Sequence, residues 1–151
     1  MITLVLSDLT ILSTTLHDIL SMKRHTVLYF YPKDDTSWCT LEAITFSDYK
    51  KDFDNLDCNI IWVSHDSDVS HIKFCKKHHL TISLISDTSL ELHQDERFQT
   101  RKEKSMYGKK YMGTERSTFV LDTSGTLLRE WRKVSVPNHI EEVLAFIQDL
   151  H

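Results

Sequence analysis

The stretch TVLYFYPKDDTSWCT, residues 26–40, joins a predicted strand to the start of a predicted helix. Thr26–Tyr31 is a short run of β-branched and aromatic residues, which is typical of a buried strand. Pro32 ends this run, and an acidic pair and two hydroxyl residues lead to Cys39. A core cysteine usually lies among aliphatic residues, whereas Cys39 lies where the strand gives way to a helix. Its position indicates either a functional thiol or a half-buried cysteine that happens to fall in a loop.

The rest of the chain continues the alternation of strands and helices. Further strands are expected at Asn59–Ser64 and Thr81–Asp87, and a hairpin at 117–122 and 126–134 around a turn at 123–125. Helices are expected at Cys39–Phe53, where Leu41, Ile44, Phe46, Tyr49 and Phe53 have near-helical spacing, at Ser67–His79, at Ser89–Phe98, and over 140–147 after Pro137. Residues 1–25 are less clear, with a strand in ITLVL and then a hairpin and a helical turn. The pattern predicts a three-layer α/β domain with a central mixed sheet flanked by helices.

Length and composition limit the possible classes of protein. The chain has 151 residues, of which 40% are hydrophobic and 26% charged, and its formal net charge is −4. This length suits a single domain spanning 1–151. The acidic balance gives no general reason to expect binding to nucleic acid or to an anionic membrane. No run approaches the roughly 18 apolar residues of a membrane span, and the amino terminus lacks the basic segment of a secretory signal. We therefore expect a cytoplasmic protein.

The three cysteines, Cys39, Cys58 and Cys75, are too few and too unevenly spaced for a disulfide framework. Cys39 is expected in the first turn of its helix, where free amide N–H groups and the helix dipole favour a thiolate. Thr36, three residues earlier, can direct its hydroxyl to the same space. Cys58 precedes a buried strand and shares a face with hydrophobic residues, which indicates a structural role.

The residues around Cys39 resemble those of a known protein family. Pro32, Thr36 and Cys39 match the P-x-x-x-T-x-x-C motif of peroxiredoxins, and YFYPKDDTSWCTLEA resembles the bacterioferritin comigratory protein, or peroxiredoxin Q, branch. The similarity continues through WVSHDS, FCKKHHL, SLISD, KSMYGKKYMGTERSTFVLD and EWRKV, from about Leu4 to Leu150. The resemblance implies a thioredoxin-like fold and a thiol peroxidase.

The resemblance also implies roles for particular residues. Cys39 would be the peroxidatic nucleophile, Thr36 would hydrogen-bond the thiolate and the peroxide, and Pro32 would shield the thiolate from bulk water. Arg116 matches the family's catalytic arginine; because a guanidinium does not deprotonate, it would hold the thiolate and orient the peroxide. Glu42 lies at a position that is often acidic in the family. It would help to hold the arginine, or only favour the start of the helix through the dipole.

The sequence departs from the family pattern at several positions. Ile44 occupies the place where many members carry a resolving cysteine, so that short-range disulfide is impossible here. The resemblance to a subset of the branch makes Cys75 the tentative resolving cysteine, on a helix whose lysines and histidines would favour its thiolate; the alternative is a core cysteine beside Val69 and Ile72. Two separate helices are not expected to bring Cα atoms within the ~7 Å of a disulfide, so we expect local unwinding before the bond forms.

Two further departures concern the pocket mouth and the amino terminus. Trp38 stands where the family usually has glycine, and it would narrow the pocket mouth in favour of bulkier apolar peroxides or pack as a lid. The Pro-Asp-Phe segment found near the start of many members is absent, which predicts a frayed first strand.

Two other patterns in the sequence compete with the peroxidase interpretation. Five residues, His65, His71, Cys75, His78 and His79, could suggest a metal site, but their spacing fits no standard zinc pattern. Residues 101–116 interleave basic and aromatic residues as nucleic-acid sites can, but the acidic balance elsewhere and the resemblance favour a loop over the active site. We expect neither metal nor cofactor.

The resulting hypothesis is a monomeric thiol peroxidase that reduces hydrogen peroxide and organic hydroperoxides. Cys39 becomes a sulfenic acid, Cys75 resolves it as an intramolecular disulfide, and thioredoxin or a similar dithiol recycles the enzyme. One alternative is a one-cysteine peroxidase in which Cys75 is merely structural. The other is a redox sensor or binding module that keeps the fold without efficient catalysis.

Overall fold

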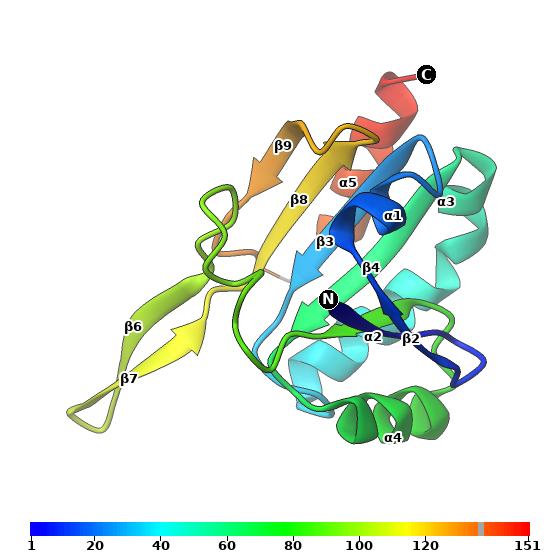
Figure 1. Cartoon of the computed structure of the whole chain (residues 1–151). Helices are drawn as coiled ribbons and strands as arrows, with labels where there is room; N and C mark the ends of the chain where they lie inside the picture. Colours follow the sequence, from blue (N-terminus) through cyan, green and yellow to red (C-terminus); the bar gives the residue numbers. More distant parts are fainter. Residues whose placement is uncertain (136–137) are drawn as a thin grey trace.

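The computed structural model describes residues 1–135 and 138–151, so Pro137, expected near the start of the last helix, lies outside the described residues. The strands of the main sheet are β1 (Ile2–Val5), β2 (Ile11–Thr14), β3 (His25–Phe30), β4 (Cys58–Ser64), β5 (Ser83–Ser86), β8 (Ser117–Asp122) and β9 (Leu127–Trp131). They form one mixed sheet in the order β2-β1-β5-β4-β3-β8-β9 (Figure 1). The helices are α1 (Leu16–Leu20), α2 (Ser37–Asp48), α3 (Lys50–Asn55), α4 (Asp68–His78) and α5 (His139–Asp149).

The sheet separates two hydrophobic clusters, which gives the predicted three layers. One cluster joins strand residues such as Tyr29 and Trp62 to buried side chains of α2, α3, α4 and α5. The other joins the opposite face to α1 and to a turn-rich segment around Leu92 and Phe98. Alternate residues of β3 point into opposite clusters, and all six are buried, as expected for a central strand. Among the described residues, no helix combines the length and apolarity needed to cross a membrane.

Sheet topology brings three chain segments to one edge. Strands β3 and β4 are parallel, with Phe30 opposite Val63, so the segments that follow them leave the sheet side by side. Strand β8 is antiparallel to β3 and pairs Ser117 with Phe30. The beginning of β8 therefore lies at the same edge as the end of β3. This arrangement places Arg116, just before β8, near the loop that leads into α2.

Several element boundaries differ from the sequence-based expectations. The helix expected over Cys39–Phe53 begins at Ser37 and is divided into α2 and α3 at Tyr49, whose backbone lies at φ −90° and ψ 0°. The helix expected at Ser89–Phe98 is a series of turns. There the Asp87 carboxylate accepts hydrogen bonds from the backbone amides of Leu92 and His93, which competes with helical hydrogen bonding. The prediction of a helix at Ser89–Phe98 was wrong.

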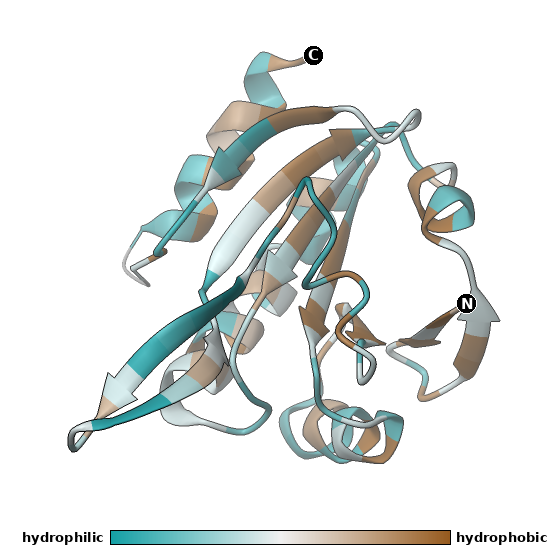
Figure 2. Cartoon of the chain, turned by 60° about the vertical axis from the view of Figure 1, so that its left-hand side comes forward, coloured by the Kyte–Doolittle hydropathy of each residue, from teal (hydrophilic) through white to brown (hydrophobic). Residues whose placement is uncertain are grey.

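Two other expectations fail, one for the first strand and one for residues 101–116. Strand β1 is not frayed, because it pairs with β2 on one side and with β5 on the other. The segment expected to be a loop over the active site instead forms β6 (Arg101–Met106) and β7 (Lys109–Thr114), a separate antiparallel hairpin. This hairpin projects from the body of the protein and is largely hydrophilic, whereas the central strands are largely hydrophobic (Figures 1 and 2). Its base approaches Arg116, in an open pocket that Lys102, Lys104 and Lys133 also line.

Candidate active site

Cys39 lies in the first turn of α2, with its side chain fully buried. Thr36 is the N-cap, and the first backbone hydrogen bond of the helix joins the Thr40 N–H to the Thr36 carbonyl at 2.8 Å. The N–H of Cys39 precedes this bond and therefore has no carbonyl partner within the helix. An unpaired amide and the positive end of the helix dipole thus lie beside the sulfur, as the sequence predicted.

Arg116 makes the direct contact with the thiol. Its Nη2 donates to Cys39 Sγ at 3.3 Å, and its Nη1 donates to the Tyr29 hydroxyl at 3.0 Å. Burial alone would lower the pKa of Arg116, but the neighbouring Tyr29 and Cys39 raise it above its ordinary value. The guanidinium therefore stays charged beside the sulfur. The structure brings together Cys39 and Arg116, which are far apart in the sequence.

Tyr29 is a site residue that the sequence analysis missed. It lies near the end of β3, fully buried, and its ring packs against Trp62 and Phe46. Burial, followed by the negative charge of Glu42, raises the pKa of Tyr29 well above its ordinary value, so its hydroxyl stays protonated. The available signal was a tyrosine in a buried strand, because such a hydroxyl needs a hydrogen-bond partner.

Glu42 occupies the next turn of α2 and is fully buried. Among the described residues, neither of its carboxylate oxygens has a hydrogen-bond partner. Burial raises the pKa of Glu42 to about 7, although the charge of Arg116 acts in the opposite direction. The expected contact that holds the arginine is thus made by Tyr29, while Glu42 acts on Arg116 through its charge and without a hydrogen bond.

The other predicted site residues lie in the loop before α2 and at the start of that helix. Pro32 is half-buried at the start of the loop that leads into α2. The Thr36 hydroxyl donates to the carbonyl of Lys33 at 3.2 Å. Its hydrogen bond is therefore made within the loop and not to the sulfur of Cys39. Trp38 is 60% exposed, which contradicts a packed lid. Leu41 and Ile44, expected on the buried side of the helix, are also exposed, because α2 directs the side of Cys39 and Glu42 into the core.

Cys75 differs from the expectation of a thiolate favoured by nearby cations. It is a free thiol in the last turns of α4, 2% exposed, in the same hydrophobic cluster as Cys39. Burial, with a smaller effect of the Asp34 charge, raises the pKa of Cys75 to about 12. The lysines of α4 are exposed, and their charges do not offset the effect of burial. Val69 is exposed as well, so it is not part of the buried face on which Cys75 lies.

The third thiol, Cys58, is buried at the start of β4. It shares a hydrophobic cluster with Ile60 and Trp62, as the sequence predicted. Burial raises the pKa of Cys58 to about 12. Its environment offers neither of the two features found at Cys39, a helix amino terminus and a contacting arginine.

Comparison with known proteins agrees with this geometry. The AhpC/TSA family model matches residues 3–129. The chain belongs to this family of peroxiredoxins. It is 47% identical over 127 residues to a Bacillus subtilis peroxiredoxin Bcp, covering 84% of this chain and 80% of that protein. It is 43% identical over 122 residues to a Xanthomonas campestris peroxiredoxin Bcp, covering 81% of this chain and 75% of that protein.

Solved peroxiredoxin structures show the same architecture. A Xanthomonas campestris peroxiredoxin Q superimposes with a TM-score of 0.83 at 39% identity, covering 97% of this chain and 89% of that chain. A structure of the bacterioferritin comigratory protein of the same species, described in terms of alkyl peroxide reduction, has a TM-score of 0.84 at 38% identity, with 98% and 90% coverage. The predicted thioredoxin-like fold is thus confirmed, and the chain is a thiol-dependent peroxidase. Family membership implies a peroxide substrate and a thiol reductant.

Proposed function

We propose that Cys39 is the peroxidatic nucleophile and that Arg116 is its catalytic partner. The observation that supports this assignment is the 3.3 Å contact from Arg116 Nη2 to Cys39 Sγ at the amino terminus of α2. The thiolate attacks one oxygen of a peroxide; the S–O bond forms, the O–O bond breaks, and the leaving oxygen takes the electron pair and a proton. Negative charge spreads over both oxygens in the transition state, where the guanidinium and the helix amides are already oriented to receive it.

The other site residues are proposed to shape the pocket. Pro32 limits the access of water to the sulfur, and Tyr29 and Glu42 fix the position and charge balance of Arg116. The Thr36 hydroxyl contacts the peroxide after turning away from the carbonyl of Lys33, to which it donates in the resting form.

We propose that both hydrogen peroxide and organic hydroperoxides are substrates. Trp38 is 60% exposed beside Cys39 and offers an apolar surface to the alkyl group of a larger hydroperoxide. The alkyl peroxide reduction described for the Xanthomonas relative supports this choice. The enzyme is proposed to act as a monomer in the cytoplasm. Three unevenly spaced cysteines form no disulfide framework and suit a reducing compartment.

The second half of the cycle is proposed to use Cys75. Its thiolate attacks the sulfur of the Cys39 sulfenic acid; an S–S bond forms, the S–O bond breaks, and the oxygen leaves as water after taking a proton. Thioredoxin or a similar dithiol then reduces the disulfide. Since Cys75 is buried on a separate helix and has a raised pKa, this step requires local unwinding of both cysteine segments.

The same two observations favour a second candidate, a one-cysteine peroxidase. In that enzyme an external thiol reduces Cys39 directly and Cys75 is a structural core residue. The two candidates share the first chemical step and differ only in what reacts with the sulfenic acid.

Intact mass after one equivalent of hydrogen peroxide, followed by a peptide map, distinguishes the two candidates. We expect a loss of two hydrogen atoms that maps to a Cys39–Cys75 disulfide. Cys75→Ser should then lose thioredoxin-dependent turnover while its first turnover with peroxide stays intact. A stable gain of oxygen on Cys39 in the unmodified protein would instead establish the one-cysteine enzyme. A chain that consumes no peroxide at one equivalent would contradict the peroxidatic role itself.

A further inference from the structure

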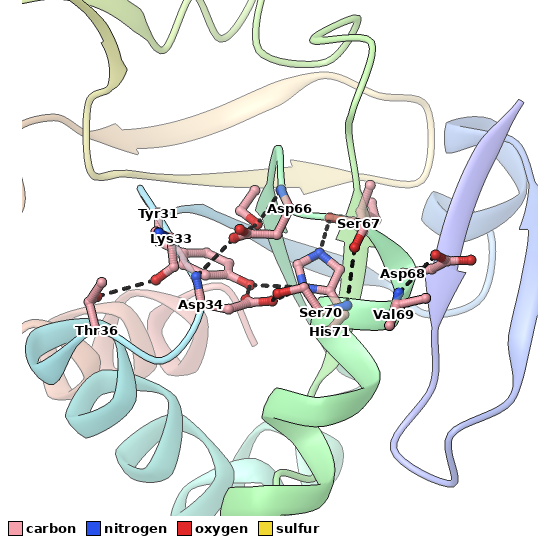
Figure 3. A network of polar contacts seen from close by, with 12 residues as sticks. Tyr31, Lys33, Asp34, Thr36, Asp66, Ser67, Asp68, Val69, Ser70 and His71 are labelled. Carbon is pink, nitrogen blue, oxygen red and sulfur yellow. Dashed lines mark hydrogen bonds and ion pairs between the residues drawn. The ribbon is translucent and has the colours of Figure 1, made fainter.

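A buried network of polar contacts joins the loop before α2 to helix α4 (Figure 3). At its centre is Asp34, which is 7% exposed. Asp34 Oδ2 accepts from Ser70 Oγ at 2.8 Å and lies 2.7 Å from His71 Nδ1, while Oδ1 accepts a hydrogen bond from the Tyr31 hydroxyl. The carboxylate thus has contacts on both oxygens, and two of the three partners lie on α4.

The contact between His71 and Asp34 must be a hydrogen bond that contains a proton. The ring is fully buried, and its Nε2 lies 3.0 Å from the carbonyl oxygen of Ile85, which can only accept. Nε2 must therefore carry one proton, and a second proton must lie on the contact between Nδ1 and Asp34. Asp34 and His71 together form a charge-assisted contact, the stronger kind of hydrogen bond.

The loop that carries Asp34 is also hydrogen-bonded to the segment that follows β4. The backbone N–H of Asp34 donates to Asp66 Oδ2 at 2.8 Å, and the same oxygen accepts from Ser64 Oγ at 2.7 Å. Asp66 follows β4, so the loop after β3 is fixed to the neighbouring segment at the same edge of the sheet. The loop cannot move away from this edge without exposing or breaking these contacts.

The network joins the two segments that carry the cysteines of the proposed disulfide, the loop before α2 and helix α4. Asp34 precedes Cys39 by five residues, and His71 precedes Cys75 by four, which is one helical turn on the same face of α4. Unwinding that carries Cys75 toward Cys39 must displace the turn that holds His71. An open pocket lined by Asp34, Ser70 and Phe74 runs along this seam and gives the two segments room to separate.

We propose that the Asp34–His71 pair is a latch that sets the rate of the resolving step. The latch holds the loop of Cys39 and the helix of Cys75 in the closed arrangement in which peroxide reacts, and it must open before Cys75 attacks the sulfenic acid. The proposal rests on the proposed function, in which Cys75 is the resolving cysteine. Asp34 and His71 are positioning residues, since neither touches the reacting sulfur.

A second pair of contacts on the surface supplies a matched control. Asp35, the next residue of the loop, bridges to the same helix through Lys77 Nζ at 2.7 Å and His78 Nε2 at 2.8 Å. The Asp35 side chain is 43% exposed, compared with 4% for Asp34. Exposed ion pairs contribute little to stability, whereas removal of one partner from a buried pair is costly. The two adjacent carboxylates therefore link the same segments with different strengths.

The test compares Asp34→Ala with Asp35→Ala by stopped-flow fluorescence of the tryptophans after a stoichiometric pulse of hydrogen peroxide. We expect Asp34→Ala to accelerate disulfide formation by roughly tenfold or more, the factor associated with one buried charged hydrogen bond. Asp35→Ala should change the rate by less than about threefold. Asp34→Asn can still hydrogen-bond a neutral imidazole, so its rate should fall between those of Asp34→Ala and the unmodified enzyme.

Two further readouts separate a latch from a general loss of structure. With Cys75→Ser in the background, the rate of sulfenic acid formation should stay within about twofold of its value without Asp34→Ala, because the closed form still predominates. In the protein that retains Cys75, Asp34→Ala should raise the peroxide dose that oxidises Cys39 to the sulfinic acid, because faster resolution competes with overoxidation.

The outcomes also separate this inference from the proposed function. An unchanged or slower disulfide step in folded Asp34→Ala overturns the latch while Cys75 keeps its resolving role. Equal acceleration by Asp35→Ala would also overturn it, because the buried pair would then have no special part. If the unmodified enzyme forms no Cys39–Cys75 disulfide, the resolving role fails and the latch fails with it.

Discussion

The two cysteines proposed to form the disulfide lie in opposite kinds of environment. Cys39 is at the beginning of a helix, beside unpaired amides and 3.3 Å from an arginine nitrogen. Cys75 is near the end of a helix, where burial raises its pKa to about 12 and the Asp34 charge acts in the same direction. Both side chains are almost completely buried, so exposure does not distinguish them. The difference lies in the polar groups that face each sulfur.

In the proposed cycle, the closed fold serves only the first chemical step. It holds the proposed nucleophile in contact with Arg116, while the second thiol is protonated and covered. A resolving thiol that stays inert until the segment unwinds leaves the peroxide pocket intact for the substrate.

The largest expected effect concerns the reactivity of Cys75 in the reduced, folded enzyme. With a pKa of about 12, its thiolate fraction at pH 8 should make alkylation roughly a thousandfold slower than in the unfolded chain. The rate should rise about tenfold per pH unit between pH 8 and 11, as long as the fold persists. Timed alkylation of Cys39→Ser, followed by peptide mass spectrometry, measures this rate. Fast labelling at pH 8 would show that the segment opens readily and would remove the contrast.

Loss of the arginine should make the first step slow without affecting Cys75. Arg116→Ala removes the donor to the sulfur and one positive charge, and we expect the second-order rate with hydrogen peroxide to fall by roughly 10²–10³. Arg116→Lys keeps the charge but not the two-pronged geometry that contacts Cys39 and Tyr29, so it should recover only part of the rate. Stopped-flow measurements at one equivalent of peroxide provide the comparison. A rate within twofold of the unmodified enzyme in Arg116→Ala would remove the arginine from the mechanism.

Glu42, buried one helical turn after Cys39, should make the stability of the protein depend on pH. Its folded pKa of about 7 lies above the ordinary 4.5, so the folded state retains the proton longer than the unfolded state does. Its contribution is fully present below pH 4.5 and is lost as the pH rises from 4.5 through 7. The loss corresponds to roughly 3 kcal/mol in the free energy of unfolding.

Glu42→Gln tests this dependence, because the amide resembles the protonated acid. Urea unfolding of the reduced proteins between pH 4 and 8 should show the two chains converging at low pH. At pH 8 the Gln variant should be the more stable. Parallel curves across the range would mean that Glu42 has the same pKa in the folded and unfolded states, so that burial does not raise it.

The sequence predicted the fold and the position of Cys39 at the start of a helix more fully than it predicted the contacts between distant segments. The runs at Thr26–Tyr31 and Asn59–Ser64 predicted two buried strands, because a central strand is hydrophobic throughout. The turns over 89–98 were missed because the Asp87 side chain, and not the local pattern, decides their conformation. Tyr29 and the Asp34–His71 pair escaped notice because their contacts depend on sheet register and on where a helix packs, which a single sequence does not show.

The smallest expected effect comes from replacing Cys58, a thiol that resembles Cys75 in burial and in its raised pKa but lies in a different element. Both thiols are buried, and burial raises the pKa of each to about 12. Cys58, however, begins a central strand, whereas Cys75 lies on a helix linked to the loop of Cys39. If the ability of the segment to unwind selects the resolving thiol, Cys58→Ala should leave thioredoxin-dependent turnover within about twofold and reduce stability by only about 1 kcal/mol. A disulfide that maps to Cys39–Cys58 in Cys75→Ser would show instead that any buried thiol can serve, and that the helix has no special part.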